Sequence, residues 1–387
     1  MKLKKLLSEW LWLVVVWIVI INVWTWLFLA SLKGFFKILE IEVLATENEL
    51  TNYWTSPYQY LEASIFGFLF GSLFFAINFF TDKFGLKNQS FGKIILTKSA
   101  FYLSAFVLVV VVTYLLLDTF KIYPDDFLEK LVEKNIHLSI LPAFLLIFGF
   151  FVLLINFFIQ TSRKFGPHNI AYMLRGKYSY PKVEDRVFLF LDLKASTTYA
   201  EKLQHIRYSN LIKDCFHQVN ELVDSYNAEI YQYVGDEVVL SWHTEKALDT
   251  LDFFKIYFAF HQAIQDKYEY YMRAYGLVPE FKAGINGGEI TVAEVGDIKR
   301  EIAYHGDVIN TASRIQGQCN VYHKRLLVSG DFLTRIQNLK GYKKEYLGEI
   351  SLRGKKSKIE IFSIEEELGV QQNSKLVPEN IKSLTAP

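Results

Sequence analysis

The sequence predicts an α+β protein in two parts, a four-helix membrane domain followed by a soluble domain with helices packed on one face of a sheet. Four long apolar stretches dominate the first 160 residues, and each is long enough to cross a hydrocarbon core of about 30 Å. The second half alternates short β-branched runs with helical patterns, in the order strand, helix, hairpin, helix, hairpin. Its 42 Lys and Arg residues nearly balance 41 Asp and Glu residues, so no basic field exists for nucleic acid, and we expect no such partner.

The apolar stretches and the composition changes after them set the expected domain boundaries. The stretches cover residues 11–32, 61–80, 100–117 and 138–159. None carries a charge at its centre, and buried helices of soluble proteins are shorter and less uniformly apolar, so we expect spans of a lipid bilayer. The expected units are the four-helix membrane domain at 1–160, a cytosolic linker at 161–185, the soluble domain at 186–366 and a flexible tail at 367–387.

The charge of the connecting segments predicts the orientation of the spans. Lys2, Lys4 and Lys5 precede the first span, and basic residues also fill the second loop and the segment after the fourth span. The first and third loops carry acidic clusters instead. Because positively charged loops stay on the cytoplasmic side, we expect a multi-pass protein of the cell (inner) membrane with both termini and the soluble domain in the cytoplasm.

The spans themselves offer little chemistry. Without an acid or base inside them, a transporter or a proton path has little support. An anchor, a dimerisation module and a sensor remain open, and the linker could pass on movement of the spans or act as a passive spacer. Interhelical hydrogen bonding is the simplest role for four amides in or near the spans, Asn22, Asn78, Asn156 and Gln160.

Two carboxylates in the soluble domain are the first candidate functional residues. Gly235 and Asp236 separate two β-branched runs, which is the signature of a tight hairpin turn. The continuous apolar run Val187–Leu191 is typical of a buried central strand, and Asp192 follows it directly. If these strands are neighbours, both carboxylates lie at one edge of the sheet, where a hard divalent cation could bind. Taken alone, Asp236 would more simply satisfy the turn.

The segment after Asp192 predicts a short loop and then a helix from about Tyr199 to Tyr226, with Ser196 or Thr197 as its cap. A helix amino terminus that follows a strand presents free backbone N–H groups, which favour a phosphate. An ordinary strand-to-helix turn is the equally weighted alternative.

The rest of the soluble domain predicts three further features. A helix from about Thr244 to Tyr275 follows the hairpin, and a second hairpin turns at Asn286-Gly-Gly288. Gly306 then interrupts the chain, and a helix capped by Asp307 runs to about Cys319. Asn310 and Arg314 are four residues apart and therefore share a face of this helix, although such a pair is usually just solvated.

Taken together, the motifs of residues 186–366 resemble the catalytic domain of class III nucleotidyl cyclases, mainly adenylate cyclases. The resemblance implies a ferredoxin-like fold for this domain. Four or six membrane spans commonly precede such domains. The four motifs occur in the family's order, and they are Phe190-Leu-Asp-Leu193 with Ser196-Thr197, Tyr233-Val-Gly-Asp-Glu237, Gly284-Ile-Asn-Gly-Gly288 and Gly306-Asp-Val-Ile-Asn-Thr-Ala-Ser-Arg314.

The resemblance implies roles for the candidate residues. Asp192 and Asp236 would hold two Mg²⁺ or Mn²⁺ ions per active site, with the Leu193 carbonyl as an added ligand. In such a site the ribose 3′-hydroxyl attacks the α-phosphorus while pyrophosphate leaves in line. Asn310 would orient the ribose, and Arg314 would offset charge that grows on the phosphoryl oxygens.

The same resemblance implies which residues bind the phosphates and how the chains assemble. The loop of Ala195, Ser196 and Thr197 would cradle phosphates, and Lys355, or Lys356 beside it, would bind the terminal ones. Family members place the aspartates and the Asn/Arg helix on opposite sides of a head-to-tail pair of domains. One chain carries both sets here, so the implied form is a homodimer with two equivalent sites, paired through the cyclase domain.

The base-specifying positions depart from the family pattern. Gln232 stands where Lys is typical of adenylate and Glu of guanylate enzymes, and Ala303 stands where Asp or Thr is usual. A Gln amide both donates and accepts, so it could serve either purine edge. We expect an adenylate cyclase that uses ATP, the commoner bacterial substrate in the family. The alternatives are a guanylate cyclase and a catalytically silent membrane receptor that only binds nucleotide.

Overall fold

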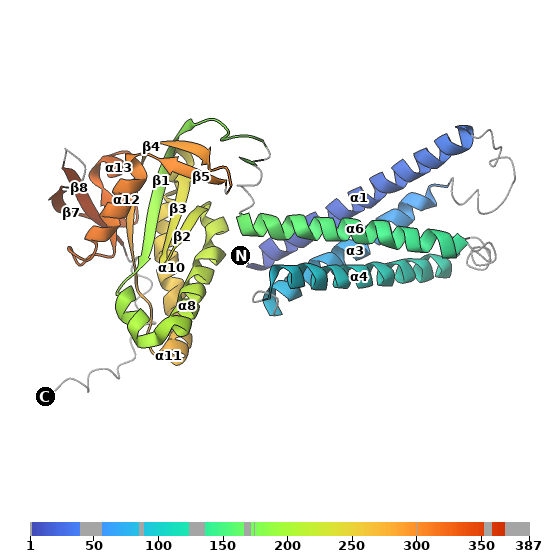
Figure 1. Cartoon of the computed structure of the whole chain (residues 1–387), viewed down its shortest axis with the longest axis horizontal. Helices are drawn as coiled ribbons and strands as arrows, with labels where there is room; N and C mark the ends of the chain where they lie inside the picture. Colours follow the sequence, from blue (N-terminus) through green and yellow to red (C-terminus); the bar gives the residue numbers. More distant parts are fainter. Residues whose placement is uncertain are drawn as a thin grey trace. The chain divides into compact units, whose positions relative to one another are not determined.

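The computed structural model describes residues 2–38, 56–84, 89–123, 136–165, 172–173, 175–298, 300–351 and 358–367. The chain divides into two compact units, residues 1–167 and 168–387. Figure 1 shows the helical first unit in blue to green and the mixed second unit in green to red.

The first unit consists of long apolar helices. They are α1 (Lys2–Ile38), α3 (Tyr58–Phe84), α4 (Phe91–Thr119) and α6 (Ile136–Phe165). Each contains a segment long and apolar enough to cross a membrane, as the sequence predicts. Aromatic side chains such as Trp17, Phe70 and Phe106 pack between the helices, while many large apolar side chains face outward, with Phe150 63% exposed. An outer surface this apolar suits contact with lipid.

Polar contacts join these helices to one another. The amides predicted to bond between helices do so in three of four cases, with Asn22 Nδ2 3.1 Å from Ser64 Oγ and Asn156 Nδ2 3.0 Å from Ser99 Oγ. Asn78 Oδ1 accepts from Lys98 Nζ at 3.2 Å. Lys98 lies within the candidate span Phe91–Thr119 and is only 1% exposed. The expectation that the spans contain no acid or base is therefore wrong for this helix, because a basic side chain is buried among the helices.

The second unit is built on a mixed sheet of eight strands in the order β2-β3-β1-β4-β6-β8-β7, with β5 paired to β4 (Figure 1). All neighbours are antiparallel except β4 and β6. The strands are β1 (Lys182–Leu193), β2 (Glu229–Val234), β3 (Glu237–His243), β4 (Phe281–Val295), β5 (Glu301–His305), β6 (Leu326–Ser329), β7 (Tyr342–Ile350) and β8 (Ile359–Glu366).

Helices cover both faces of this sheet, whereas the order of elements in the sequence predicts them on one face. On β1, Leu189 and Leu191 join the main core with the helices of one face, while Phe188 and Phe190 pack with Ala312 of α12 on the other. The period-two alternation of a strand produces this division. The helices are α8 (Ser196–Val223), α9 (Thr244–Thr250), α10 (Asp252–Asp266), α11 (Tyr268–Tyr275), α12 (Asp307–Gln318) and α13 (Gly330–Thr334), with a 3₁₀ turn at Asp224–Tyr226.

The predicted second hairpin is wrong, because β4 runs unbroken through Asn286-Gly-Gly288. Its glycines serve close packing rather than a turn. A Cβ atom at Gly284 would lie 2.6 Å from the Ala312 carbonyl oxygen of α12, and one at Gly287 would lie 2.5 Å from the ring of Phe332. Only glycine lets the strand approach both helices this closely.

The predicted helix from Thr244 to Tyr275 is divided into α9, α10 and α11. Leu251 adopts a left-handed conformation with φ of 53° between the first two, and Lys267 separates the last two. Burial explains the break, because Phe253 and Phe254 are fully buried after the turn at Leu251. The helical pattern alone does not reveal such a change of direction.

Candidate active site

The strand register brings the two candidate aspartates to one edge of the sheet. Asp192 of β1 is paired directly with Glu237 of β3, and Asp236 immediately precedes Glu237. Directly opposed residues have Cα atoms about 4.5–5.5 Å apart, so Asp236 and Asp192 are near neighbours. The prediction that these strands lie side by side is confirmed.

Asp192 is held by two donors that local sequence patterns do not reveal. Its Oδ2 atom lies 3.2 Å from Lys282 Nζ and accepts from Gln316 Nε2 at 2.7 Å. Burial raises the pKa of Asp192, Lys282 and Gln316 lower it, and Asp236 raises it, with a net upward shift. Lys282 is the direct partner of Asp192 across β1 and β4, a relation that requires the strand register, and Gln316 reaches it from α12.

Asp236 is half-buried rather than at a fully exposed tip. Its Oδ2 atom is buried and has no hydrogen-bond partner among the described residues. A buried carboxylate oxygen without a partner is costly, and a divalent cation between Asp236 and Asp192 would supply one. No group of three or more His, Cys, Asp or Glu side chains in the described part of the chain is arranged for a metal. A cation held by this pair would need further ligands beyond these two carboxylates.

Glu237 adds a third carboxyl group at this edge. Burial raises its pKa, the charges of Asp192 and Asp236 raise it further, and Lys282 lowers it, which leaves a pKa of about 7. The shift therefore reflects burial first and the two neighbouring carboxylates second.

The loop after Asp192 differs from the prediction. Helix α8 begins at Ser196, and the residue at its cap position is Ala195, in a left-handed conformation with φ of 55° and without a side-chain cap. The expectation that Ser196 or Thr197 caps the helix is therefore wrong. An uncapped first turn leaves backbone N–H groups without side-chain partners, directly after the strand that ends at Leu193.

Asn310 and Arg314 lie on a part of α12 that faces away from the sheet. Asn310 is exposed and donates to the Gly306 carbonyl at 3.3 Å, and Arg314 is half-buried. Residues of an α-helix advance about 100° each, so Arg314 lies about 200° around the axis from Gln316. Gln316 contacts Asp192 of the same chain, so Arg314 is directed to the opposite side.

Gln232 and Ala303, the positions predicted to specify the base, lie on two strands whose adjacent tyrosines are in contact. Gln232 of β2 is exposed, and Ala303 of β5 is half-buried opposite Ala293 of β4. The adjacent Tyr231 and Tyr304 rings pack edge to face with centroids 4.7 Å apart. This contact joins β2 and β5 one residue away from each of these two positions.

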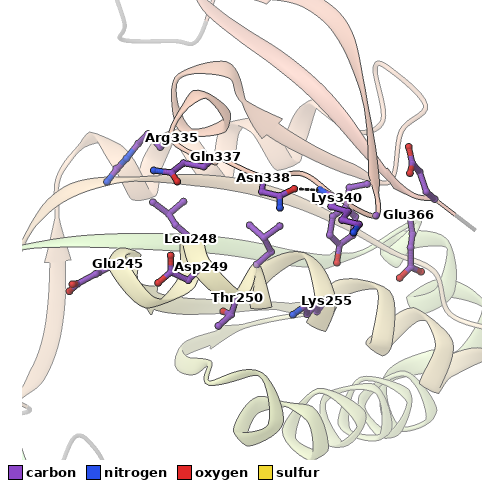
Figure 2. Close-up of a pocket in the computed structure, with 14 residues that line it drawn as sticks. Glu245, Leu248, Asp249, Thr250, Lys255, Arg335, Gln337, Asn338, Lys340 and Glu366 are labelled. Carbon is purple, nitrogen blue, oxygen red and sulfur yellow. Dashed lines mark hydrogen bonds between the residues drawn. The ribbon is translucent and has the colours of Figure 1, made fainter. Parts of the chain in front are cut away.

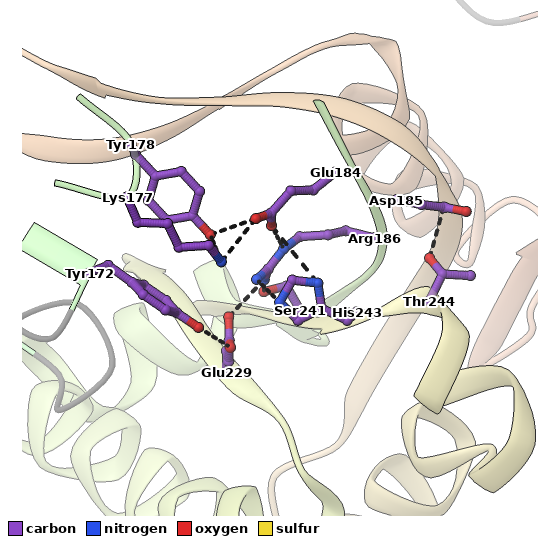
Figure 3. Close-up of polar contacts among 10 residues, drawn as sticks. All are labelled: Tyr172, Lys177, Tyr178, Glu184, Asp185, Arg186, Glu229, Ser241, His243 and Thr244. Atoms are coloured by element: carbon purple, nitrogen blue, oxygen red, sulfur yellow. Dashed lines mark hydrogen bonds and ion pairs between the residues drawn. The ribbon is translucent and has the colours of Figure 1, made fainter. Parts of the chain in front are cut away.

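A buried charge cluster, which we call the Arg186 cluster, lies at the other end of β1 (Figure 3). Arg186 is fully buried, and its guanidinium also lies 5.2 Å from the ring centroid of Tyr304. It joins β1, β2 and β3 through Glu184 at 2.9 Å, Glu229 at 2.7 Å, Ser241 at 2.9 Å and His243 at 2.9 Å.

The Arg186 cluster also holds the segment that precedes β1. Tyr178 Oη donates to Glu184 at 2.8 Å, and Lys177 Nζ lies 3.0 Å from the same carboxylate. Tyr172 Oη donates to Glu229 at 3.4 Å. Burial alone would raise the pKa of Glu184, but hydrogen bonds from Arg186, Lys177 and Tyr178 lower it to about 2.

A separate cavity of about 660 Å³ lies between α9, α10 and the segment that precedes β7 (Figure 2). Its lining mixes cations such as Lys255 and Lys340 with acids such as Asp249 and Glu366. None of the predicted site residues lines it. Lys355, predicted for the terminal phosphates, and its alternative Lys356 lie outside the residues that the structure describes.

Comparison with known proteins identifies relatives of the second unit. Residues 179–366 match the family described as "Adenylate and Guanylate cyclase catalytic domain". Adenylate cyclase 2 of Rhizobium meliloti (strain 1021) is 31% identical over 210 residues, which cover 54% of this chain and 58% of that protein. Adenylate cyclase 1 of the same organism is 27% identical over 187 residues, 46% of this chain and 27% of that protein.

The chain therefore spans little more than half the length of the first of these relatives and about a quarter of the second. Among solved structures, the adenylyl cyclase CyaB from P. aeruginosa aligns with a TM-score of 0.43 at 18% identity, over 49% of this chain and 97% of that one.

Proposed function

Because residues 179–366 belong to the family of adenylate and guanylate cyclase catalytic domains, we propose that the protein is a membrane-anchored adenylate cyclase. It would convert ATP to 3′,5′-cyclic AMP and pyrophosphate. The observation that carries the proposal is the aspartate pair, with the buried, unpartnered Asp236 oxygen beside Asp192. Four helices apolar enough to cross a membrane support the anchor, and the charge pattern of their loops supports a cytoplasmic catalytic domain.

The metal site in this proposal consists of Asp192, Asp236 and the Leu193 carbonyl. These groups would hold two Mg²⁺ or Mn²⁺ ions, since oxygen ligands suit hard divalent cations. When bound, such cations neutralise the triphosphate and make the ribose 3′-hydroxyl more acidic.

The remaining residues would position and stabilise the reacting groups. Backbone N–H groups of the loop at Ala195, Ser196 and Thr197 suit phosphate oxygens, and Lys355 would bind the terminal phosphates. In the reaction the 3′-oxygen forms a bond to the α-phosphorus, its proton leaves, and the bond to the pyrophosphate oxygen breaks. Asn310 would orient the ribose, and Arg314 would stabilise negative charge on the phosphoryl group as it transfers.

The active form in this proposal is a homodimer through the cyclase domain. Support comes from α12, because Gln316 faces Asp192 of its own chain while Arg314 is directed to the opposite side. Asn310 and Arg314 would therefore complete the site of the partner subunit, and symmetry would give two equivalent sites. A monomer should have no cyclase activity.

ATP is the proposed substrate. Two adenylate cyclases are among the similar proteins, and the Gln232 amide offers both a donor and an acceptor to a purine edge. Purified full-length protein in detergent with Mn²⁺ and either ATP or GTP tests the proposal, with cyclic product identified by mass. Cyclic AMP from ATP, lost in Asp236→Asn, is the expected result. Cyclic GMP from GTP as the only product would make the protein a guanylate cyclase, and nucleotide binding without turnover would make it a silent receptor.

A further inference from the structure

Gln316, on the buried face of α12, contacts Asp192, one of the two candidate metal ligands. Gln316 is 6% exposed, and its Nε2 atom donates to Asp192 Oδ2 at 2.7 Å across 124 residues of sequence. Lys282 Nζ lies 3.2 Å from the same oxygen. Hydrogen bonds to a charged acceptor are short and strong, so these two donors fix the orientation of the carboxylate.

The contact depends on an unusually close approach of strand and helix. A Cβ atom at Gly284 would collide with the backbone of Gln316 and lie 2.6 Å from the Ala312 carbonyl oxygen. The missing side chain lets α12 lie directly on β4, and this position brings the Gln316 amide within reach of Asp192 on the neighbouring strand. Gln316 follows Arg314 by only two residues on α12, so the contact with Asp192 also fixes the position of Arg314.

We propose that Gln316 is a positioning residue that holds Asp192 in the orientation required to bind divalent cations. The inference rests on the proposed function and deepens it. With Oδ2 occupied by two protein donors, Oδ1 would remain available to a cation shared with Asp236. Partners that orient a metal ligand in this way typically change metal affinity by about 10–100-fold when they are removed.

The same helix would then serve both active sites of a dimer. Gln316 holds Asp192 of its own chain, while Arg314, about 200° around the axis, is directed toward the partner's site. Any displacement of α12 therefore changes a metal ligand in one site and a charge-stabilising residue in the other. A substitution of Gln316 should therefore impair the metal ligand of its own chain. A residue that only packs α12 against the sheet would not act on one of the two sites in particular.

Mn²⁺ binding to the full-length protein tests the proposal directly. Free Mn²⁺ is measured by its electron paramagnetic resonance signal during titration, without any turnover. Gln316→Met keeps the shape and removes the donor, and we expect its Kd for Mn²⁺ to rise about 10–100-fold. Gln316→Glu places a like charge beside Asp192 and should weaken binding at least as much; it carries the test if Gln316→Met does not fold. Gln318→Met, on the same helix, should bind as the wild type does. A Kd for Gln316→Met within about twofold of wild type would overturn the proposal.

Mixed dimers separate positioning from packing. A dimer of one Asp192→Ala chain and one Arg314→Ala chain retains a single complete site, in which the intact Asp192 belongs to the Arg314→Ala chain. Gln316→Met on that chain should raise the Mn²⁺ concentration needed for half-maximal rate, whereas the same substitution on the Asp192→Ala chain should not. Equal effects from both placements would contradict the positioning role. If no cyclic product forms even in wild type, the proposed function fails while the Mn²⁺ titration still decides the role of Gln316.

Discussion

Removal of the Arg186 guanidinium should destabilise the second unit strongly. The side chain is fully buried and neutralises two carboxylates that are only partly exposed, Glu184 at 12% and Glu229 at 24%. Arg186→Met fills similar space but leaves both acids without their main partner. Loss of one member of a buried ion pair costs about 3–5 kcal/mol.

This loss of free energy of unfolding can be converted to a decrease in melting temperature. A unit of 150–250 residues loses about 2–4 °C per kcal/mol, so Arg186→Met should melt about 6–20 °C below wild type. Differential scanning calorimetry of the full-length protein in detergent measures this transition. Lys182→Met removes an exposed charge from the same strand and should change stability by less than about 0.5 kcal/mol.

A charge-neutral variant tests the cause. Arg186→Met combined with Glu184→Gln and Glu229→Gln removes the charges of both ion pairs that Arg186 makes, and leaves the Lys177 ammonium, a partly exposed partner of Glu184. Replacing a whole buried ionic group is often close to neutral. The triple variant should therefore recover most of the lost melting temperature. If Arg186→Met alone melts within a degree or two of wild type, the Arg186 cluster does not contribute substantially to the stability of the unit.

Three further results are expected. Arg314→Ala should lower kcat by about 10³–10⁵, by analogy with arginine fingers, with unchanged Mn²⁺ binding; loss of Mn²⁺ binding would place Arg314 in the wrong role. Gly284→Ala should destabilise the second unit by about 1–3 kcal/mol through overpacking against α12, and an unchanged melting temperature would contradict the close approach. The pKa of Glu184 is lowered to about 2 from an ordinary 4.5, so its stabilising effect is present above about pH 4.5 and is lost as pH falls through about 2; the deficit of Glu184→Gln should shrink over that range in calorimetric scans.

Local patterns were enough to predict the edge of the sheet that carries the aspartates. The hairpin is recognisable from β-branched residues on both sides of Gly235-Asp236. The buried strand is recognisable from the continuous apolar run that ends before Asp192. Their pairing followed because antiparallel neighbours place a strand end beside a hairpin turn. The apolar helices of the first unit are equally easy to predict, since length and composition alone define them.

Other features depend on tertiary contacts and could not be predicted in this way. Asn286-Gly-Gly288 has the composition of a turn, but its glycines are required by α12 and Phe332, which are distant in sequence. Lys282 and Gln316 meet Asp192 only through the register of β4 and the position of α12. Arg186 stands in a charged stretch of sequence, and nothing in that stretch indicates that its side chain is buried. Its partners lie on three different strands, which come together only in the folded sheet.

The most direct measurement of the central claim is the binding of Mn²⁺ to wild type and to the two aspartate variants, with 3′-deoxy-ATP present to prevent cyclisation. If Asp192 and Asp236 share the cations, wild type should bind two Mn²⁺ ions per site with spin coupling between them in the electron paramagnetic resonance spectrum. Asp192→Asn and Asp236→Asn should each abolish the coupled signal. Coupled binding that survives either substitution would contradict the account.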